Sequence, residues 1–399
     1  MKSRACLLPL VASCLIGAAP VSPRWVPGWY APPIGYEPQI KEAFGRPFNN
    51  DSVRQSLYST VAGTTIRVRL SNELSATRTK IGAATIVRLD ANGEPVEGSL
   101  RPLTFANARS VLLPAGAPML SDPIRFPVKA GERLAVSVFY PEETALPGHA
   151  QMVDVAAEDV TGATRLPNPR RARATGIVSA LEVVRPSATR VLVALGDSIT
   201  EGAGSTRAQS YPDQLGRLLA ADAAGRCWTV VNAGISSNRL LSEGRGPNAL
   251  SRFDRDVLAV PNVTHVAILE GINDIGRVRD PAKERQPAAG ELIAAYEQLL
   301  ARASARGVKV IFGTLLPYEG AAYADAEGEK RRSTVNQWLR ANKTRFAGLI
   351  DFDLAMREPG QPTVMRLSQQ IGDHLHPNDA GYATMARTAL PVVRAQGCR

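Results

Sequence analysis

A serine and an Asp-x-x-His pair are the residues of this chain whose types and spacing could carry out nucleophilic chemistry. Ser198 lies in the segment GDSIT (196–200), and Asp373 and His376 lie in DHLHP (373–377). A serine hydroxyl is a weak nucleophile until a base takes its proton. His376 could be that base, and Asp373, one turn away, could fix its tautomer and stabilise the imidazolium. Together they predict attack on an ester carbonyl and a covalent acyl-enzyme.

Attack by a serine leaves a negative charge on the carbonyl oxygen, and three groups could bind that oxyanion. They are the backbone N–H groups of Ser198 and Gly234 and the side-chain amide of Asn273, which lies in the segment GIND (271–274). Gly234 has no side chain to shield its N–H. Removal of one such donor typically slows catalysis by roughly 100- to 1,000-fold. We therefore predict an oxyanion hole formed by these three residues.

Two further residues are candidates for contact with the substrate. Asp197 precedes the serine, and it either holds the turn by hydrogen bonds or faces the substrate. Tyr318 lies in the loop 315–328, which follows an apolar run, although a loop tyrosine packs against its neighbours for many reasons.

The chain has four histidines, and one of them has the surroundings of a catalytic base. His376 has a carboxylate three residues before it and a proline after it, and His374 has neither. His149 falls in a region of β-type pattern and His265 at the start of a strand, so we expect both to be structural. A metal site at the His-x-His pair lacks an evident third ligand.

The chemistry-bearing residues follow short apolar runs that alternate with helical patterns. The apolar runs lie at 191–195, 228–231, 265–269, 308–316 and 349–352, and the helical patterns at 211–223, 248–259, 291–306, 330–343 and after Pro377. Such alternation predicts a five-stranded parallel sheet in a three-layer α/β/α domain. The ligand of such a sheet lies beyond the carboxyl ends of the strands, where Ser198, Gly234 and Asn273 fall.

The preceding part of the chain, from about Asp51, alternates mostly with period 2. Its β-type runs lie at 64–70, 81–89, 110–113 and 133–139. Many short strands with turn signals predict an all-β sandwich or jelly-roll-like domain. The Pro- and Arg-rich segment 166–175 predicts a loop before a last strand at 177–184.

Four blocks of the sequence resemble the SGNH/GDSL hydrolase family in order and in strand position. They are GDSIT (196–200), Gly234 in NAGISSNRLL, GIND (271–274) and DHLHP (373–377). The resemblance implies a flavodoxin-like sheet, hydrolysis of carboxylic esters and no cofactor. Residues 70–73 (LSNE) and 81–84 (IGAA) are similar to the β-domain of a secreted, two-domain subgroup of these hydrolases.

The first residues have the pattern of a secretory signal peptide. Lys2 and Arg4 precede the apolar stretch 5–19, and small residues at 18–22 suit cleavage there. The same stretch also fits a bacterial lipoprotein box, in which Cys14 would carry the lipid. The expected organisation is a signal peptide at 1–22, a Pro-rich segment at 23–50, a β-sandwich-like domain at 51–186 and the hydrolase domain at 187–399.

Removal of such a leader would leave two cysteines, Cys227 and Cys398. In an oxidising compartment they could form one disulfide, and the alternative is two unpaired thiols. The sequence has no Cys-x-x-Cys motif and no Cys/His zinc spacing, so we expect no structural metal.

The net charge of +10 makes an anionic partner worth weighing. The arginines are scattered, however, and the densest run is only 169–173, which favours a solvated surface over a nucleic-acid site. The chain also lacks a phosphate-binding GxxxxGK[ST] segment. We therefore expect no nucleic acid, no nucleotide cofactor and no stable membrane insertion, and the sequence does not reveal the oligomeric state.

These features together predict a secreted serine esterase that removes acetyl or other short acyl groups from a carbohydrate. The reason for a carbohydrate is the sandwich-like domain, an architecture often used to hold glycans. The expected partner is a small-molecule or polysaccharide ester. A lipid or lysophospholipid acylhydrolase is the alternative with the same chemistry, and a non-catalytic glycan-binding protein is the alternative from a different class.

Overall fold

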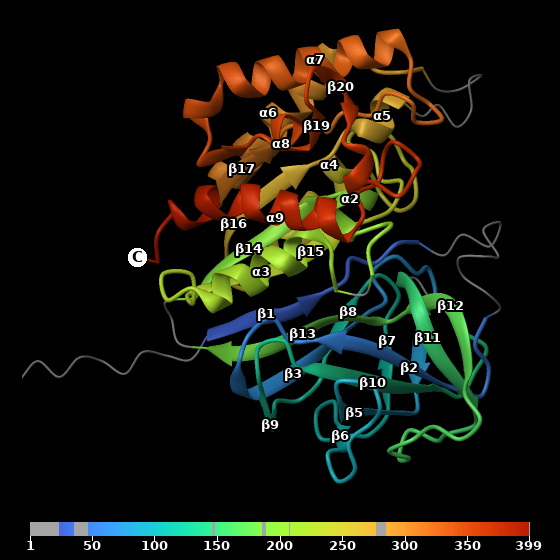
Figure 1. Cartoon of the computed structure of the whole chain (residues 1–399). Helices are drawn as coiled ribbons and strands as arrows, with labels where there is room; N and C mark the ends of the chain where they lie inside the picture. The colour runs from blue at the N-terminus through green and yellow to red at the C-terminus, as the bar shows by residue number, and fades with distance from the viewer. Residues whose placement is uncertain are drawn as a thin grey trace, which may run out of the picture.

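A computed structural model of the chain describes residues 24–35, 47–145, 148–185, 189–206, 208–276 and 285–398. These residues form an all-β unit and an α/β unit, which lie one below the other in Figure 1. The signal peptide predicted at residues 1–22, with Cys14, lies outside the described residues.

The strands of the α/β unit form a parallel sheet. They are β14 (Arg190–Gly196), β15 (Trp228–Gly234), β16 (Val263–Leu269), β17 (Lys309–Gly313) and β18 (Gly348–Ile350). Their order is β15-β14-β16-β17-β18. Residues 191–196 of β14 are all buried, as expected for a strand that is covered on both faces.

Helices follow the strands of this sheet. They are α2 (Ser198–Glu201), α3 (Tyr211–Ala221), α4 (Ala249–Phe253), α5 (Ile272–Gly276), α6 (Ala289–Ser304), α7 (Ala326–Ala341), α8 (Phe352–Met356) and α9 (Asp379–Arg394). Short helical turns η1 (Asp254–Leu258), η2 (Lys343–Arg345) and η3 (Leu367–Gln369) and the hairpin β19 (Arg357–Glu358) and β20 (Gln361–Met365) complete the unit. Helix α3 packs on α9, and α6 packs on α4 and α7. Figure 1 shows α3 and α9 in front of the sheet, and the predicted three-layer α/β/α architecture is confirmed.

The strands of the all-β unit pair antiparallel. They are β1 (Arg24–Tyr30), β2 (Asp51–Tyr58), β3 (Gly63–Ser71), β4 (Thr79–Ile81), β5 (Ala83–Leu89), β6 (Arg101–Leu103), β7 (Val111–Leu113), β8 (Pro118–Leu120), β9 (Ile124–Val128), β10 (Arg133–Tyr140), β11 (His149–Ala157), β12 (Arg170–Gly176) and β13 (Val178–Arg185). One sheet has the order β1-β13-β3-β8, with β9 on β3, and the other has the order β12-β11-β2-β10-β5-β6. The all-β architecture predicted for this part of the chain is confirmed.

The loop predicted at residues 166–175 is wrong from Arg170 onward, because Arg170–Gly176 forms strand β12 and pairs with β11. In this strand Ala172 and Ala174 are shielded, whereas Arg171 and Arg173 are exposed. The Arg-Ala alternation is thus the period-2 pattern of an edge strand, where charged side chains are common. The prolines that suggested a loop lie just before the strand.

The Pro-rich segment contributes strand β1, which joins the two units. β1 pairs with β13 in the all-β unit and packs beside β15, the edge strand of the parallel sheet. Thr229 of β15 donates a hydrogen bond through Oγ1 to the carbonyl oxygen of Pro27, over 3.2 Å. Tyr30 reaches further and donates to Asp256 Oδ1 over 2.9 Å. The start of the described chain therefore forms part of the contact between the units.

A disulfide joins the start of β15 to the end of the described chain. Cys227, just before β15, and Cys398 form a disulfide with a Cα–Cα distance of 5.8 Å.

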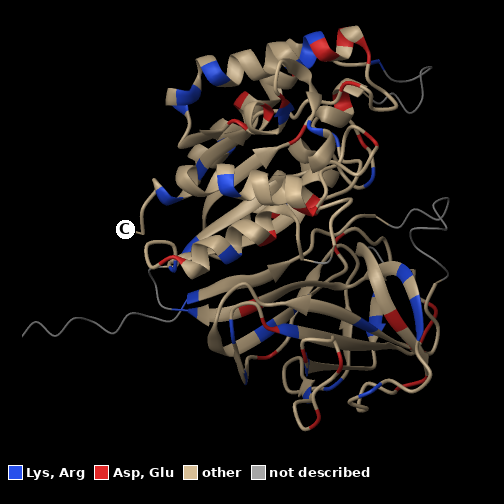
Figure 2. Ribbon diagram, viewed as in Figure 1, with Lys and Arg blue, Asp and Glu red and all other residues tan. Residues whose placement is uncertain are grey.

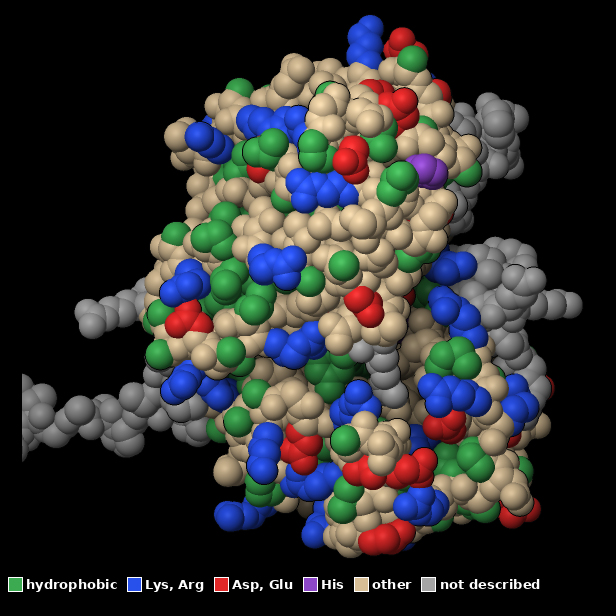
Figure 3. Space-filling view, in the orientation of Figure 1, with side chains coloured by type: hydrophobic (Ala, Val, Ile, Leu, Met, Phe, Trp, Pro, Cys, Tyr) green, Lys and Arg blue, Asp and Glu red, His purple; other side chains and the backbone are tan. Residues whose placement is uncertain are grey.

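Basic and acidic side chains are interspersed over both units, and the face seen in Figure 3 shows the same mixture (Figures 2 and 3). Within the described ranges, none of the helices combines the length and the apolar character that crossing a bilayer requires.

Candidate active site

Ser198 lies in a tight turn at the carboxyl end of β14. Asp197 caps α2, because its Oδ1 accepts a hydrogen bond from the Ile199 N–H at 2.8 Å. Ser198 is the first residue of that helix and is 6% exposed. The N–H groups in the first turn of a helix have no acceptor within the helix. The turn therefore places the hydroxyl and the N–H of Ser198 at the sheet edge where ligands bind.

A continuous chain of hydrogen bonds joins Ser198, His376 and Asp373. Ser198 Oγ lies 2.8 Å from His376 Nε2, and His376 Nδ1 lies 2.6 Å from Asp373 Oδ2. In the tautomer with a proton on Nδ1, His376 donates to Asp373 and accepts the serine proton on Nε2. The geometry suits transfer of the Ser198 proton to His376 during attack on a carbonyl carbon.

Asp373 is held in place by its own turn. Its Oδ1 accepts hydrogen bonds from the N–H groups of Leu375 and His376, at 3.0 and 2.9 Å. Burial raises the pKa of Asp373, but the hydrogen bonds from His376 and Leu375 lower it further, so that the pKa lies below its ordinary value of 3.8. The carboxylate is therefore ionised wherever His376 can work as a base.

Asn273 is a buried amide at the start of α5, with 3% of its surface exposed. Its Nδ2 donates to the carbonyl oxygen of Asn238 at 3.0 Å, and its Oδ1 accepts from the hydroxyl of Tyr323 at 3.4 Å. An amide nitrogen carries two protons. One proton of Asn273 is used on Asn238, and the second is the one that could bind an oxyanion.

Gly234 does not act as the oxyanion donor that the sequence predicts. Its N–H donates to the Oδ1 of Asn232 at 2.8 Å. A Cβ at this position would lie 2.2 Å from the backbone nitrogen of Glu201, so the glycine allows α2 to approach β15 closely. The oxyanion role predicted for Gly234 is therefore wrong, because its N–H is already bonded to a side chain two residues away.

The turn after β15, formed by residues 235–238, lies between Asn273 and the end of α2. The N–H of Asn238 closes it on the carbonyl oxygen of Ile235 at 3.0 Å. Ser237 has a φ of +62°, a left-handed conformation that costs energy for a side chain with Cβ. Sequence reasoning missed this turn, and only the Ser-Ser-Asn run after the strand could have drawn attention to it.

A buried arginine below the site was also missed. The guanidinium of Arg252 donates to the carbonyl oxygens of Gly196 and Ala233, at 2.9 and 2.8 Å, and to Oδ1 of Asn238 at 2.9 Å. Its partner Asp256 lies 3.1 Å away. The only signal in the sequence is the spacing of four residues between Arg252 and Asp256 on a helix that is otherwise largely buried.

Three buried carboxyl groups, those of Asp197, Glu270 and Asp274, lie close enough to interact electrostatically, and Arg252 lies near the first two. Burial raises the pKa of Asp197 to about 7 and that of Asp274 to about 6, and it raises the pKa of Glu270 too. Asp274 accepts hydrogen bonds from the N–H groups of Leu240 and Leu241. A network of buried charges and hydrogen bonds therefore lies next to the site and holds the ends of β14 and β15 in place.

The other candidate residues do not reach the triad. Asp197 and Tyr318 are each 1% exposed, so their side chains present little surface to a substrate. Asp197 holds the turn instead, which was the other interpretation of this residue. His374 accepts a hydrogen bond at Nδ1 from the side-chain Nε2 of Gln370 at 3.3 Å, and it is His376 that meets Ser198.

Residues 194–384 match the model of the GDSL-like Lipase/Acylhydrolase family. A lipase/acylhydrolase from Enterococcus faecalis is 21% identical in sequence, with a TM-score of 0.42. The match covers 52% of this chain and 97% of the Enterococcus chain. A variant of an acetyl xylan esterase from Geobacillus stearothermophilus is 24% identical, with a TM-score of 0.40, over 51% and 94%. A GDSL-like lipase from Bacteroides thetaiotaomicron is 19% identical, with a TM-score of 0.38, over 52% and 89%.

A search among curated proteins found no match. The matched residues begin in β14, and they include the turn of Ser198 and the Asp373–His376 segment. The α/β unit of this chain is therefore a domain of the GDSL-like lipase/acylhydrolase family, and the protein is a carboxylic ester hydrolase.

Proposed function

We propose that Ser198 is the nucleophile of this ester hydrolase and that His376 is its general base. His376 takes the proton of Ser198 as the serine attacks the ester carbonyl, and Asp373 stabilises the imidazolium that forms. The Ser198 N–H and the second proton of Asn273 Nδ2 bind the oxyanion. His376 then protonates the leaving alcohol, and it activates a water molecule that releases the acyl group from Ser198.

The observation that carries this proposal is the chain of hydrogen bonds from Ser198 through His376 to Asp373, at 2.8 and 2.6 Å. The test is turnover of p-nitrophenyl acetate by Ser198→Ala. We expect the release of p-nitrophenol to fall to the level of the buffer, with an unchanged circular dichroism spectrum. Ser251→Ala, at an exposed serine of the same domain, is the matched control. Full activity in Ser198→Ala would contradict the mechanism.

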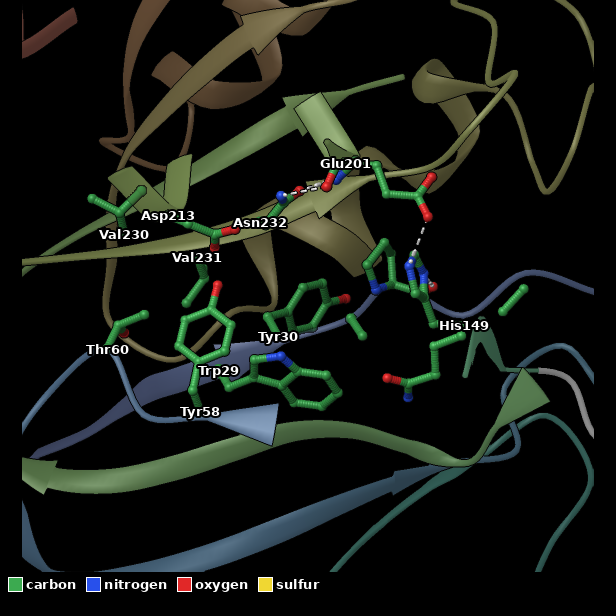
Figure 4. A pocket seen from close by; sticks show the side chains of 15 residues that line it. Trp29, Tyr30, Tyr58, Thr60, His149, Glu201, Asp213, Val230, Val231 and Asn232 are labelled. Atoms are coloured by element: carbon green, nitrogen blue, oxygen red, sulfur yellow. Dashed lines mark hydrogen bonds and ion pairs between the residues drawn. The ribbon is translucent and has the colours of Figure 1, made fainter. Parts of the chain in front are cut away.

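We propose that the acyl group is acetyl or another short chain and that the alcohol is a carbohydrate. The support is a cavity of about 220 Å³ between the two units, lined by the rings of Trp29 and Tyr58 and by the amide of Gln151 (Figure 4). Aromatic faces with a few hydrogen-bonding groups suit a sugar ring. The cavity also borders Glu201, which ends the helix that Ser198 begins.

Two assays separate the substrate classes. A panel of acetylated polysaccharides is incubated with the enzyme and the released acetate is measured, and a series of p-nitrophenyl esters from acetate to palmitate gives the preferred chain length. We expect acetate release and a fall in kcat/KM beyond short chains. A preference for long chains would make the protein a lipid acylhydrolase instead.

A non-catalytic glycan-binding protein is the alternative from a different class, and the same cavity favours it. A fluorophosphonate probe reacts only with an activated serine. We expect labelling of the parent protein and none of Ser198→Ala. Absence of labelling in the parent, together with retention on a glycan column, would support the binding protein.

We propose that the protein is exported. The support is the charged and apolar pattern at residues 1–22 and the Cys227–Cys398 disulfide, because disulfides persist in oxidising compartments. Mass spectrometry of the mature N-terminus tests this. We expect a chain that starts within residues 18–23, and a lipidated Cys14 would identify a lipoprotein instead.

A further inference from the structure

An ion pair joins the all-β unit to the helix that carries the nucleophile. His149 is the first residue of β11, and its Nε2 lies 3.2 Å from Oε1 of Glu201, the last residue of α2. The two side chains are 15% and 22% exposed. Figure 4 shows them at one end of the cavity between the units, where His149 points from the all-β unit towards Glu201.

Glu201 also contacts the turn 235–238. Its second oxygen, Oε2, accepts a hydrogen bond from the N–H of Ser236. Ser236 leads to Asn238, and the carbonyl oxygen of Asn238 accepts from Asn273 Nδ2 at 3.0 Å. A continuous path of contacts therefore runs from a strand of the all-β unit to the amide that binds the oxyanion in the proposed mechanism.

We propose that His149, supplied by the all-β unit, is a positioning residue for ester hydrolysis: through Glu201 it holds the turn 235–238 and thereby orients Asn273. The proposal rests on the proposed function of Ser198 and Asn273, and it gives the all-β unit a part in the reaction. Neither His149 nor Glu201 is required to touch the substrate.

The geometry requires His149 in its charged form. Its Nδ1 lies 3.1 Å from the carbonyl oxygen of Pro32, and its Nε2 faces the carboxylate of Glu201. Both partners are acceptors, and only an imidazolium donates from both ring nitrogens. Rigid attachment on both sides fixes the ring, so that Glu201 has one position in which to meet Ser236.

The charges around the pair agree with this state. Burial lowers the pKa of His149, as does the charge of Arg173 on β12, but Glu201 and Pro32 raise it more, so that it lies above the ordinary value of 6.5. Burial raises the pKa of Glu201, but the hydrogen bonds from His149 and Ser236 lower it more. The pKa of Glu201 therefore lies below its ordinary value of 4.5.

Two other titratable groups lie close enough to Glu201 to interact with it electrostatically. They are Asp197 at the start of its own helix and Tyr382 on α9. Neither supplies a positive charge, so within the described residues the charge of His149 is the one that compensates Glu201.

A pH dependence follows. The part that His149 plays in hydrolysis depends on its proton. A group whose pKa is raised stays protonated below its ordinary pKa and loses the proton as the pH passes through the raised value. We therefore expect kcat to fall above pH 6.5, as His149 loses its proton.

The test compares His149→Gln, Glu201→Gln and the double variant with the full-length parent enzyme on p-nitrophenyl acetate. We expect each single variant to lower kcat roughly 10-fold at pH 7 with little change in KM, because a slight shift of an oxyanion donor is felt in the transition state. The double variant should be no slower than the single ones, since both act through one contact. Arg165→Gln and Glu94→Gln break an ion pair elsewhere in the all-β unit and should leave kcat unchanged.

The pH profile distinguishes positioning from a general loss of stability. We expect the alkaline fall of kcat in the parent to coincide with the titration of His149 followed by NMR, and to be absent in His149→Gln. Wild-type kcat in both single variants, or an alkaline fall in the parent at a pH unrelated to His149, would overturn the proposal. Ser198→Ala run in parallel keeps the two questions apart, because its full activity would overturn the proposed function and not the positioning alone.

Discussion

Arg252 Nη2 donates a 2.9 Å hydrogen bond to the carbonyl oxygen of Gly196, two residues before Ser198. The same guanidinium holds Ala233 at the end of β15. One buried cation therefore ties together the carboxyl ends of two neighbouring strands, at the place where the chain turns into the site. The position of the nucleophile depends on a side chain that no substrate can reach, because the side chain of Arg252 is 0% exposed.

Arg252→Met should destabilise the protein by about 3–5 kcal/mol, because it leaves Asp256 and the strand-end carbonyls without their partner in a dry interior. Urea unfolding followed by fluorescence measures this. Arg394→Met, which breaks a partly exposed pair with Asp222, is the control and should change stability by less than about 1 kcal/mol. Equal midpoints for the two variants would show that the buried network contributes little.

Asn273→Ala should lower kcat by roughly 100- to 1,000-fold with a small effect on KM, because the lost proton acts on the charge of the transition state. Steady-state kinetics on p-nitrophenyl acetate provide the measurement. Asn92→Ala, at an exposed turn of the all-β unit, should retain full activity. A rise in KM alone would instead place Asn273 in ground-state binding.

Asp373→Asn should lower kcat by roughly 10⁴-fold, because an amide at this position favours the wrong tautomer of His376. Thermal unfolding near that of the parent is expected, since the oxygen of the introduced amide can still accept from the Leu375 and His376 N–H groups. Activity within tenfold of the parent would mean that Asp373 does not orient the base.

Asp197→Asn should make stability less dependent on pH. Burial raises the pKa of Asp197 from 3.8 to about 7, so the folded protein holds this proton more tightly than the unfolded chain does. Folding stability therefore falls as the pH rises from 3.8 towards 7, and the neutral amide removes that contribution while it can still accept from Ile199.

Urea midpoints at pH 5 and pH 8 measure the effect of Asp197→Asn. We expect the difference between the two midpoints to shrink in this variant. Asp90→Asn, at an exposed turn, should retain the difference of the parent. A larger difference in Asp197→Asn would contradict the assigned direction of the pKa.

Replacement of Cys227 and Cys398 by serine should lower stability by about 2–5 kcal/mol, because the bridge spans 171 positions of the chain and restricts the unfolded state. Chemical denaturation of the double variant measures this, and dithiothreitol should shift the parent in the same direction. Activity at 25 °C should remain, since the bridge lies at the opposite ends of the strands from Ser198. Insensitivity of the parent to reductant would show that the thiols are not joined.

Local pattern was sufficient for the parallel sheet and for the meeting of Ser198 with His376. Short apolar runs mark buried strands, and residues at their ends share one edge of the sheet. Pattern misled at Arg170–Gly176, where prolines before an edge strand imitated a loop. It also misled at Gly234, whose amide is bound by a neighbour two residues away.

Contacts between distant segments could not be predicted in the same way. His149 was expected to be structural, and nothing in its own segment points to Glu201, 52 positions later. Arg252 and Glu270 meet only because their strands and helices pack together. Such contacts depend on tertiary packing, which one sequence read locally does not contain.

The position of strand β1 beside β15 affects the solubility expected of the isolated hydrolase domain. An edge strand of a parallel sheet leaves a row of backbone N–H and C=O groups open to pairing with another molecule, which promotes aggregation. Here the edge at β15 is shielded by a segment from the far end of the chain, anchored through Pro27 and Thr229. A hydrolase domain cut free at Arg190 would lose that shield, and its solubility would depend on the unit that was removed.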